Sequence, residues 1–249
     1  MNKNEDIGRL FSLIQNAGHL VALTGAGVST LSGIRDFRGK NGLYNEMDAE
    51  KIFDIEYFEK DPSLYYTQAG SFIYNIDEKE PSIVHLVLGE LEQKGFLKAL
   101  ITQNIDLLHQ KGGSKKVIEI HGSPRLHYCL RCAGVRVSFE EAAAVVQKGE
   151  MPKCPKCGRV LKPAITFFGE SLPADALTQA VNESQKADLM LVLGTSLTVQ
   201  PAASMPRYTL DSGGKIVIVN NMHTPLDGRA LLHFDDLGTV FEELKHLLI

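Results

Sequence analysis

Apolar residues recur three or four positions apart in several stretches of the chain, and this spacing predicts helices. It predicts an amphipathic helix over residues 5–17, a second helix over 81–95 and a closing helix around 240–247. Residues 39–80 carry most of the tyrosines but show little strand-like alternation. We therefore expect residues 39–80 to form a helical insertion.

Continuous apolar runs lie between the helical stretches and predict buried strands. The runs cover residues 20–23, 189–193 and 215–219, and residues 97–102 are predicted as a further strand. A run of this kind is typical of a strand that is covered on both faces, as in a parallel sheet. Strands and helices in alternation predict the α/β class, with an open, parallel, Rossmann-like sheet and helices on both of its faces.

Two insertions interrupt this alternation and are expected to form a smaller domain. One is the helical segment 39–80, and the other is residues 124–160, which contain all four cysteines. The remaining ranges, 1–38, 81–123 and 161–249, would form the larger domain around the sheet.

The four cysteines form two C-x-x-C pairs, and this spacing predicts a zinc site. The residues are Cys129, Cys132, Cys154 and Cys157. Each pair sits on a turn that lets two sulfurs converge on one ion, which favours a tetrahedral zinc over redox-active thiols. Four thiolates leave no open coordination position, so the zinc is expected to be structural.

The net charge of the chain argues against some classes of binding partner. A formal net charge of −4 argues against a general binder of nucleic acid or of anionic membranes. The polar residues 1–6 do not resemble a signal peptide, and no apolar run is long enough to span a membrane. We expect a cytoplasmic enzyme with no membrane attachment and no direct nucleic-acid partner.

A glycine-rich turn follows the first predicted strand and indicates a nucleotide site. Gly25 and Gly27 would let the backbone approach a pyrophosphate closely. The dinucleotide fingerprint of dehydrogenases is nevertheless absent, because Thr30 stands where its third glycine would be. The charged and aromatic residues 36–38 follow instead. The turn is expected to hold a nucleotide for a reaction other than hydride transfer.

Small polar residues follow each predicted strand. In open α/β sheets, ligands bind beyond the carboxyl ends of the strands. The strand exits are Thr24–Gly27, Thr102–Asp106, His121–Gly122, Gly194–Ser196 and Asn220–Asn221. Five such exits in one chain indicate a ligand with many hydrogen-bonding groups.

Taken together, these motifs resemble those of the sirtuins, the NAD-dependent protein lysine deacylases, over nearly the whole chain and in the family's order. The matching blocks are Gly25–Ser29, Gly33–Arg38, Thr102–Asp106, Ile120–Gly122, the two cysteine pairs, Phe168–Glu170 and Gly194–Ser196. The resemblance implies that NAD is consumed. An acetyl group would pass from lysine to ADP-ribose, with release of nicotinamide and O-acetyl-ADP-ribose.

The resemblance also implies roles for individual residues. His121 would be the catalytic base, because imidazole titrates near neutral pH, while the other seven histidines are expected to be structural. Asn104 and Asp106 would hold the nicotinamide ribose and carboxamide. Cofactor contacts would come from Gly25, Ala26, Gly27, Ser29, Asp36, Phe37, Arg38, Gln103, Asn104, Asp106, Gly194, Thr195, Ser196, Asn220, Asp236 and Leu237. The acetyl-lysine peptide would contact Thr166, Phe168, Gly169, Glu170, Leu197, Thr198 and Val199.

The chain departs from the family's pattern at three places. Arg35 replaces the proline usual before Asp-Phe-Arg, so that loop is expected to be looser. Ala164 and Thr166 replace an Asn and a Val. Tyr66 aligns with the Tyr of a Tyr-x-x-Arg motif found in desuccinylating members, but Ala69 stands in place of the arginine. A buried acyl carboxylate would then be unpaired, which predicts a preference for acetyl or other uncharged acyl groups.

Two alternative functions stay open at this point. The same NAD site could serve a protein mono-ADP-ribosyltransferase, since both reactions begin with loss of nicotinamide. The zinc ribbon, with its local positive charge, could instead define a non-catalytic binding module. The presence of His121, Asn104 and Asp106 together favours deacylation.

Overall fold

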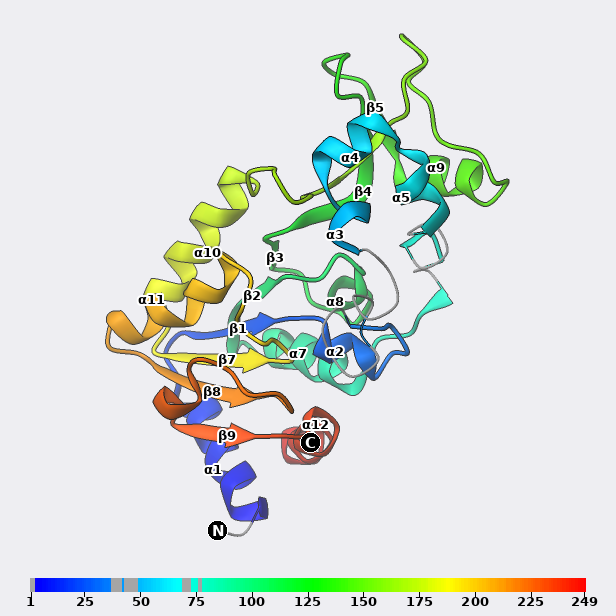
Figure 1. Ribbon diagram of the computed structural model, residues 1–249. Coiled ribbons are helices and arrows are strands. Elements are labelled where there is room, and N and C mark those ends of the chain that lie inside the picture. Colours follow the sequence, from blue (N-terminus) through cyan, green and yellow to red (C-terminus); the bar gives the residue numbers. More distant parts are fainter. Residues whose placement is uncertain (1–2, 37–41, 43–48, 69–72, 76–77) are drawn as a thin grey trace.

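The structure is a computed structural model that describes residues 3–36, 42, 49–68, 73–75 and 78–249 (Figure 1). Phe37, Arg38 and Ala69, which the sequence analysis singled out, lie outside the described residues.

A six-stranded parallel sheet forms the centre of the larger domain. Its strands lie in the order β3-β2-β1-β7-β8-β9, so the chain starts in the middle, builds one side and then returns to build the other. The bounds are Leu20–Thr24 (β1), Leu97–Thr102 (β2), Val117–Glu119 (β3), Leu189–Leu193 (β7), Lys215–Val219 (β8) and Leu232–Phe234 (β9). This order is that of doubly wound nucleotide-binding folds, and it confirms the predicted open parallel sheet.

Successive residues of each central strand enter two different hydrophobic cores. In β1, Leu20 and Ala22 pack in the core with helices α1, α7 and α12, whereas Val21 and Leu23 pack in the core with α10 and α11. The helices are Lys3–Asn16 (α1), Ile83–Gln93 (α7), Ala174–Lys186 (α10), Met205–Asp211 (α11) and Leu237–Leu248 (α12). Because both faces are covered, every residue of the central strands β1 and β7 is buried.

The smaller domain combines a three-stranded antiparallel sheet with short helices, above the large sheet in Figure 1. Strands Gly122–Tyr128 (β4), Arg136–Ser138 (β5) and Lys162–Ile165 (β6) pack with helices Ala49–Ile52 (α3), Ile55–Lys60 (α4), Ser63–Gln68 (α5) and Phe139–Val146 (α9). Its core is aromatic, with Phe167 edge-on to Phe53 and Phe58 at ring-centroid distances of 5.8 and 5.5 Å. The small sheet extends past both ends of the range 124–160.

Four short helical elements follow β1, β2 and β7 or precede β9. They are Gly27–Thr30 (α2), Leu108–Lys111 (α8), Ala202–Ser204 (η3) and Asp227–Arg229 (η4). None of the described helices has both the length and the apolar character needed to cross a bilayer.

Candidate active site

A cavity of about 880 Å³ opens at the carboxyl ends of β1, β2, β7 and β8, where the two domains meet. Of the predicted catalytic, cofactor and peptide residues that the structure describes, all but Leu197 line this cavity. Leu197 has a φ of 54° and is 5% exposed, and it packs in the core with α10 and α11. Residues far apart in sequence are therefore gathered at one site.

The glycines after β1 and β7 allow two backbone segments to touch. A Cβ on Gly25 would lie 2.7 Å from the carbonyl oxygen of Gly194, and a Cβ on Gly27 would lie 2.7 Å from the Gly194 Cα. The N–H of Gly27 donates to the Gly194 carbonyl at 2.9 Å, and that of Gly25 donates to Leu193 at 3.0 Å. These two N–H groups are thus used within the chain, and what the glycines provide is the close approach of β1 to β7.

Asn104, Ser29 and Asp106 form one hydrogen-bonded group on the cavity wall. The Asn104 amide nitrogen donates to the Gly25 carbonyl and to Ser29 Oγ, both at 3.1 Å. Ser29 Oγ donates to Asp106 Oδ2 at 2.6 Å, and the Leu108 N–H donates to Asp106 Oδ1 at 3.0 Å. Since both amide protons of Asn104 are used, its carboxamide oxygen is left as an acceptor for a ligand. Burial raises the pKa of Asp106, and the bonds from Ser29 and Leu108 oppose this rise.

His121 lies between β3 and β4 in the state that a general base requires. Its Nδ1 is 2.9 Å from the Gln103 carbonyl oxygen, which can only accept, so Nδ1 carries the proton. The neutral ring then has its lone pair on Nε2. Burial lowers the pKa of His121, while the bond to the carbonyl works in the opposite direction. The ring therefore stays neutral, and able to accept a proton, at pH values below those at which histidine usually becomes protonated.

Two further side-chain bonds order the cavity between β2 and β7. Gln103 Nε2 donates to Thr195 Oγ1 at 3.0 Å, which ties the exit of β2 to that of β7. The hydroxyls of Ser196 and Thr198 lie 3.0 Å apart on the loop after β7. All four side chains belong to residues that line the cavity.

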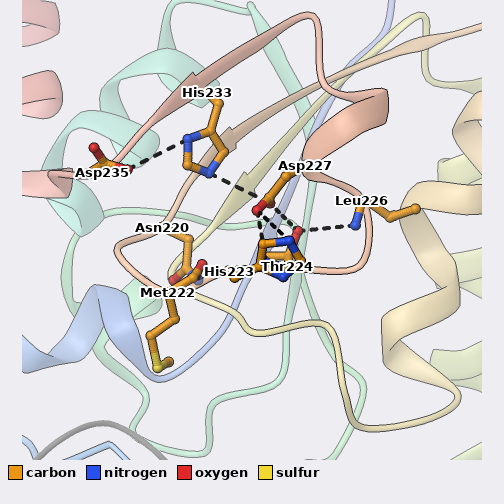
Figure 2. A network of polar contacts seen from close by, with 8 residues as sticks. All are labelled: Asn220, Met222, His223, Thr224, Leu226, Asp227, His233 and Asp235. Atoms are coloured by element: carbon orange, nitrogen blue, oxygen red, sulfur yellow. Dashed lines mark hydrogen bonds and ion pairs between the residues drawn. The ribbon is translucent and has the colours of Figure 1, made fainter.

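A polar network links the loop after β8 with β9 (Figure 2). Asp227 accepts bonds from the Thr224 hydroxyl at 2.5 Å and the Thr224 N–H at 3.1 Å, which closes the loop after β8. His233 on β9 lies between Asp227 and Asp235, with nitrogen–oxygen distances of 3.6 and 3.7 Å. Asp236 accepts the Thr239 N–H at 2.7 Å and so caps α12.

The loop that follows β6 is already paired on one side with the helical insertion. The N–H of Phe168 donates to the Phe53 carbonyl at 2.7 Å, and the Phe168 carbonyl accepts the Ile55 N–H at 3.0 Å. The backbone groups of Phe168 are thus engaged within the chain. The neighbouring Gly169 has a φ of 89°, a left-handed conformation that favours glycine.

A buried ion pair holds this loop in place. Lys162 is 0% exposed, and its Nζ lies 2.8 Å from Glu170 Oε2 and 2.7 Å from the Ile165 carbonyl oxygen. The ammonium also lies 4.0 Å from the centroid of the Phe167 ring. Glu170 Oε2 accepts the Phe167 N–H at 2.8 Å, so the loop folds around the charge.

The four cysteines converge in the smaller domain. Their sulfurs all lie within 4.8 Å of one another, with Cys129 and Cys154 buried. Four soft sulfur donors at this spacing fit a tetrahedral zinc, as the sequence predicted, and leave no coordination position for a substrate. The zinc would therefore stabilise the fold of the ribbon.

Tyr66 does not face the cavity. Its hydroxyl donates to the Leu161 carbonyl at 2.6 Å, and its ring is stacked on Tyr74 with a centroid distance of 5.9 Å. It is part of the aromatic core of the smaller domain.

Comparison with known proteins agrees with this geometry. The model of the Sir2 family matches residues 25–201. A relative named NAD-dependent protein deacetylase, from Thermotoga maritima, is 45% identical over 223 residues, which are 90% of this chain and 90% of the relative. The chain belongs to the Sir2 family.

Solved Sir2 structures share the whole fold. One, described as Sir2 with a p53 peptide and NAD⁺, has a TM-score of 0.87 and 42% identity, and the match covers 97% of both chains. Another Sir2 structure, a histidine-to-alanine variant with a deacetylated p53 peptide and 3′-O-acetyl-ADP-ribose, has a TM-score of 0.90 at 42% identity and covers 97% of both chains. The sirtuin resemblance read from the motifs is thereby confirmed.

Apolar residues of this Sir2 cavity were missed by reading the sequence. Among them are Phe53, Ile73, Ile105, Ile165, Phe167 and Leu172. These six come from the helical insertion, from the loop after β2, and from β6 and the segment that follows it. Each resembles an ordinary core residue in its local pattern. Only the tertiary structure shows that these side chains line the cavity.

Proposed function

We propose that this protein is an NAD-dependent protein lysine deacetylase. The observation that carries the proposal is the neutral His121, with its Nε2 lone pair, on the wall of the cavity that also holds Asn104 and the glycine turn. NAD, when bound, supplies the ADP-ribosyl group that accepts the acetyl group as nicotinamide leaves. Relatives and solved structures of the family carry names consistent with this activity.

Each polar residue of the cavity has a part in that reaction. His121 Nε2 takes a proton from a ribose hydroxyl, which makes the hydroxyl able to attack the acyl carbon. The carboxamide oxygen of Asn104 accepts a hydrogen bond from the nicotinamide ribose. Asp106, which is linked to Asn104 through Ser29, holds the carboxamide group of nicotinamide. Gln103 also orders the ribose, while Gly25–Ser29, Gly194–Ser196 and Asn220 surround the phosphates and the adenosine. Asp36, Phe37, Arg38, Asp236 and Leu237 complete our proposed cofactor site.

The peptide substrate would enter between the two domains. Four residues of the cavity would contact it: Gly169 and Glu170 from the loop after β6, and Thr198 and Val199 from the loop after β7. Backbone bonds from both loops would add the peptide as an extra strand, which makes binding largely independent of its sequence. Thr166 and Phe168 would contact the acyl-lysine, and Leu197 would support Thr198 from the core.

The acyl group that this site favours is uncharged. Apolar side chains line the part of the cavity beside Thr166, and the hydroxyl of Tyr66 is used by the Leu161 carbonyl. A succinyl carboxylate there would lose its hydration without gaining the Tyr and Arg partners that desuccinylating members provide. We also infer a cytoplasmic location, where thiols stay reduced and can bind zinc, with acetyl-lysine proteins as partners and no direct binding of nucleic acid.

A product assay tests the proposal and separates it from protein ADP-ribosylation. The protein is incubated with an acetyl-lysine peptide, with and without NAD, and peptide mass and nicotinamide are followed. Deacetylation predicts a peptide that loses one acetyl group only when NAD is present. A peptide or protein that gains ADP-ribose and keeps its acetyl group would support the transferase instead.

A further inference from the structure

A line of buried side chains leads from α7 and α8 to the backbone of Asn104. His109 Nε2 lies 2.8 Å from Thr24 Oγ1, and Thr24 Oγ1 donates to Thr102 Oγ1 at 2.9 Å. Thr102 Oγ1 also accepts the Asn104 N–H at 3.1 Å. The residues His109, Thr24 and Thr102 are 1%, 0% and 3% exposed, so bulk water does not supply substitute partners. We call these three residues and His85 the relay.

Hydrogen-bond directions fix where the protons of the relay lie. The single hydroxyl proton of Thr24 goes to Thr102, so Thr24 accepts its bond from His109. His109 must then carry its proton on Nε2 and keep a lone pair on Nδ1. The relay needs this tautomer. In the other one, a lone pair on His109 Nε2 would face a lone pair on Thr24 Oγ1, and no hydrogen bond could form.

His85 on α7 has the complementary tautomer. Its Nδ1 lies 3.0 Å from the N–H of Ser82, which donates to it, so the proton of this ring is on Nε2. The two rings have centroids 4.6 Å apart. His85 Nε2 and His109 Nδ1 are both buried, and neither has a partner among the described residues. One is a donor and the other an acceptor, so the tautomer that the bond to Thr24 requires of His109 is compatible with the adjacent His85 ring.

The relay ends on the residue that the proposed reaction depends on. Asn104 is held through its side chain by Gly25 and Ser29, and through its backbone N–H by Thr102. The backbone bond sets the path of the chain as it leaves β2. A shift there would move the carboxamide oxygen that faces the cavity.

We propose that His109 is a positioning residue for Asn104, acting through Thr24 and Thr102, with its tautomer fixed by the bond to Thr24. This inference rests on the proposed deacetylase function, in which Asn104 orients the nicotinamide ribose. Loss of the relay would displace Asn104 but leave the peptide-binding loop around Glu170 intact. The expected signature is a lower kcat with an unchanged KM for the acetyl-lysine peptide.

Two pairs of variants separate this role from simple packing. Thr102→Val keeps the shape of a β-branched side chain but removes the hydroxyl, whereas Thr102→Ser keeps the hydroxyl. His109→Leu removes the donor, whereas His109→Gln retains a donor near the Nε2 position. We expect kcat to fall about tenfold or more in the Val and Leu variants, and to stay within about twofold of wild type in the Ser and Gln variants. The Thr102→Val/His109→Leu double variant should lose no more than either single variant, because both break the same relay.

Thr209→Val is the matched control for loss of a buried hydroxyl. Thr209 is 0% exposed and donates to the Ser184 carbonyl at 2.7 Å, between α11 and α10. Its removal should lower the melting temperature without changing kcat.

Backbone amide exchange of Asn104 gives a readout that does not depend on activity. We expect slow exchange in the wild type and Thr209→Val, and faster exchange in Thr102→Val and His109→Leu. A folded His109→Leu protein with wild-type kcat and wild-type exchange at Asn104 would overturn the inference. If the wild type removes no acetyl group, the proposed function fails, while exchange at Asn104 still decides the positioning role.

Discussion

This protein buries neutral histidines. Acid should therefore destabilise it at pH values well above those at which carboxylates usually become protonated. His127 is the most direct case. It is 0% exposed, and its Nε2 lies 2.6 Å from the Tyr74 hydroxyl. Burial, followed by the nearby charge of Lys162, lowers the pKa of His127 to about 4. Burial likewise lowers the pKa of His85 to about 4.

The size of the effect follows from these pKa values. An unfolded histidine titrates near 6.5, so between pH 6.5 and about 4 the unfolded chain binds more protons than the folded one. Stability is therefore fully present above pH 6.5 and is lost as the pH falls through this window. Each of the two histidines should cost about 1.4 kcal/mol per pH unit, or roughly 3 kcal/mol by pH 4.

Urea unfolding at several pH values between 7.5 and 4 measures this dependence. His127→Gln keeps a partner for Tyr74 but does not titrate, so its unfolding free energy should fall less steeply, by about 1.4 kcal/mol per pH unit. Val87→Ala, at a fully buried apolar position on α7, should lower the free energy by a similar amount at every pH and keep the wild-type slope. A His127→Gln slope equal to that of the wild type would refute the reasoning.

Three further predictions concern the zinc, the glycine turn and the buried lysine. A chelator that removes zinc should lower the melting temperature, and metal analysis should find one zinc per chain; well under one would count against the site. Gly194→Ala should destabilise the fold by roughly 2 kcal/mol or more, because its φ is 59° and the new Cβ would lie 2.6 Å from the Val28 nitrogen; denaturant unfolding checks this. Lys162→Met should cost about 3 kcal/mol by leaving the Glu170 carboxylate without its cation, and the added change Glu170→Gln should recover much of the loss; no recovery would mean that the charge is not the cause.

Much of the fold was predictable because the apolar sequences of the central strands identify them as strands. The predicted strands 97–102, 189–193 and 215–219 agree with β2, β7 and β8. The edge strand β9 is not visible in this way, since it is three residues long, includes the exposed His233 and pairs with β8 alone. Its place in the sheet depends on pairing with a distant segment.

The structure shows where the predicted site residues lie, whereas their roles stay predictions. His121, Asn104 and the glycine turn, which the motifs singled out, all line one cavity. The sequence suggested that Gly25 and Gly27 let the backbone approach a pyrophosphate closely, and the structure adds that their own N–H groups donate to Leu193 and Gly194. His109 was expected to be an ordinary structural histidine, and only its distance to Thr24, which is bonded to Thr102, connects it to the backbone of Asn104. Contacts between remote segments cannot be read from local patterns.

The most direct test of the central claim is the product balance of a single reaction. The wild-type protein is incubated with NAD and a peptide that carries a labelled acetyl group, and all products are quantified. Our account predicts that each lysine freed is matched by one nicotinamide and one labelled acetyl-ADP-ribose, and that His121→Ala lowers the rate at least about a hundredfold. Release of the label as free acetate without consumption of NAD, or full activity in His121→Ala, would contradict it.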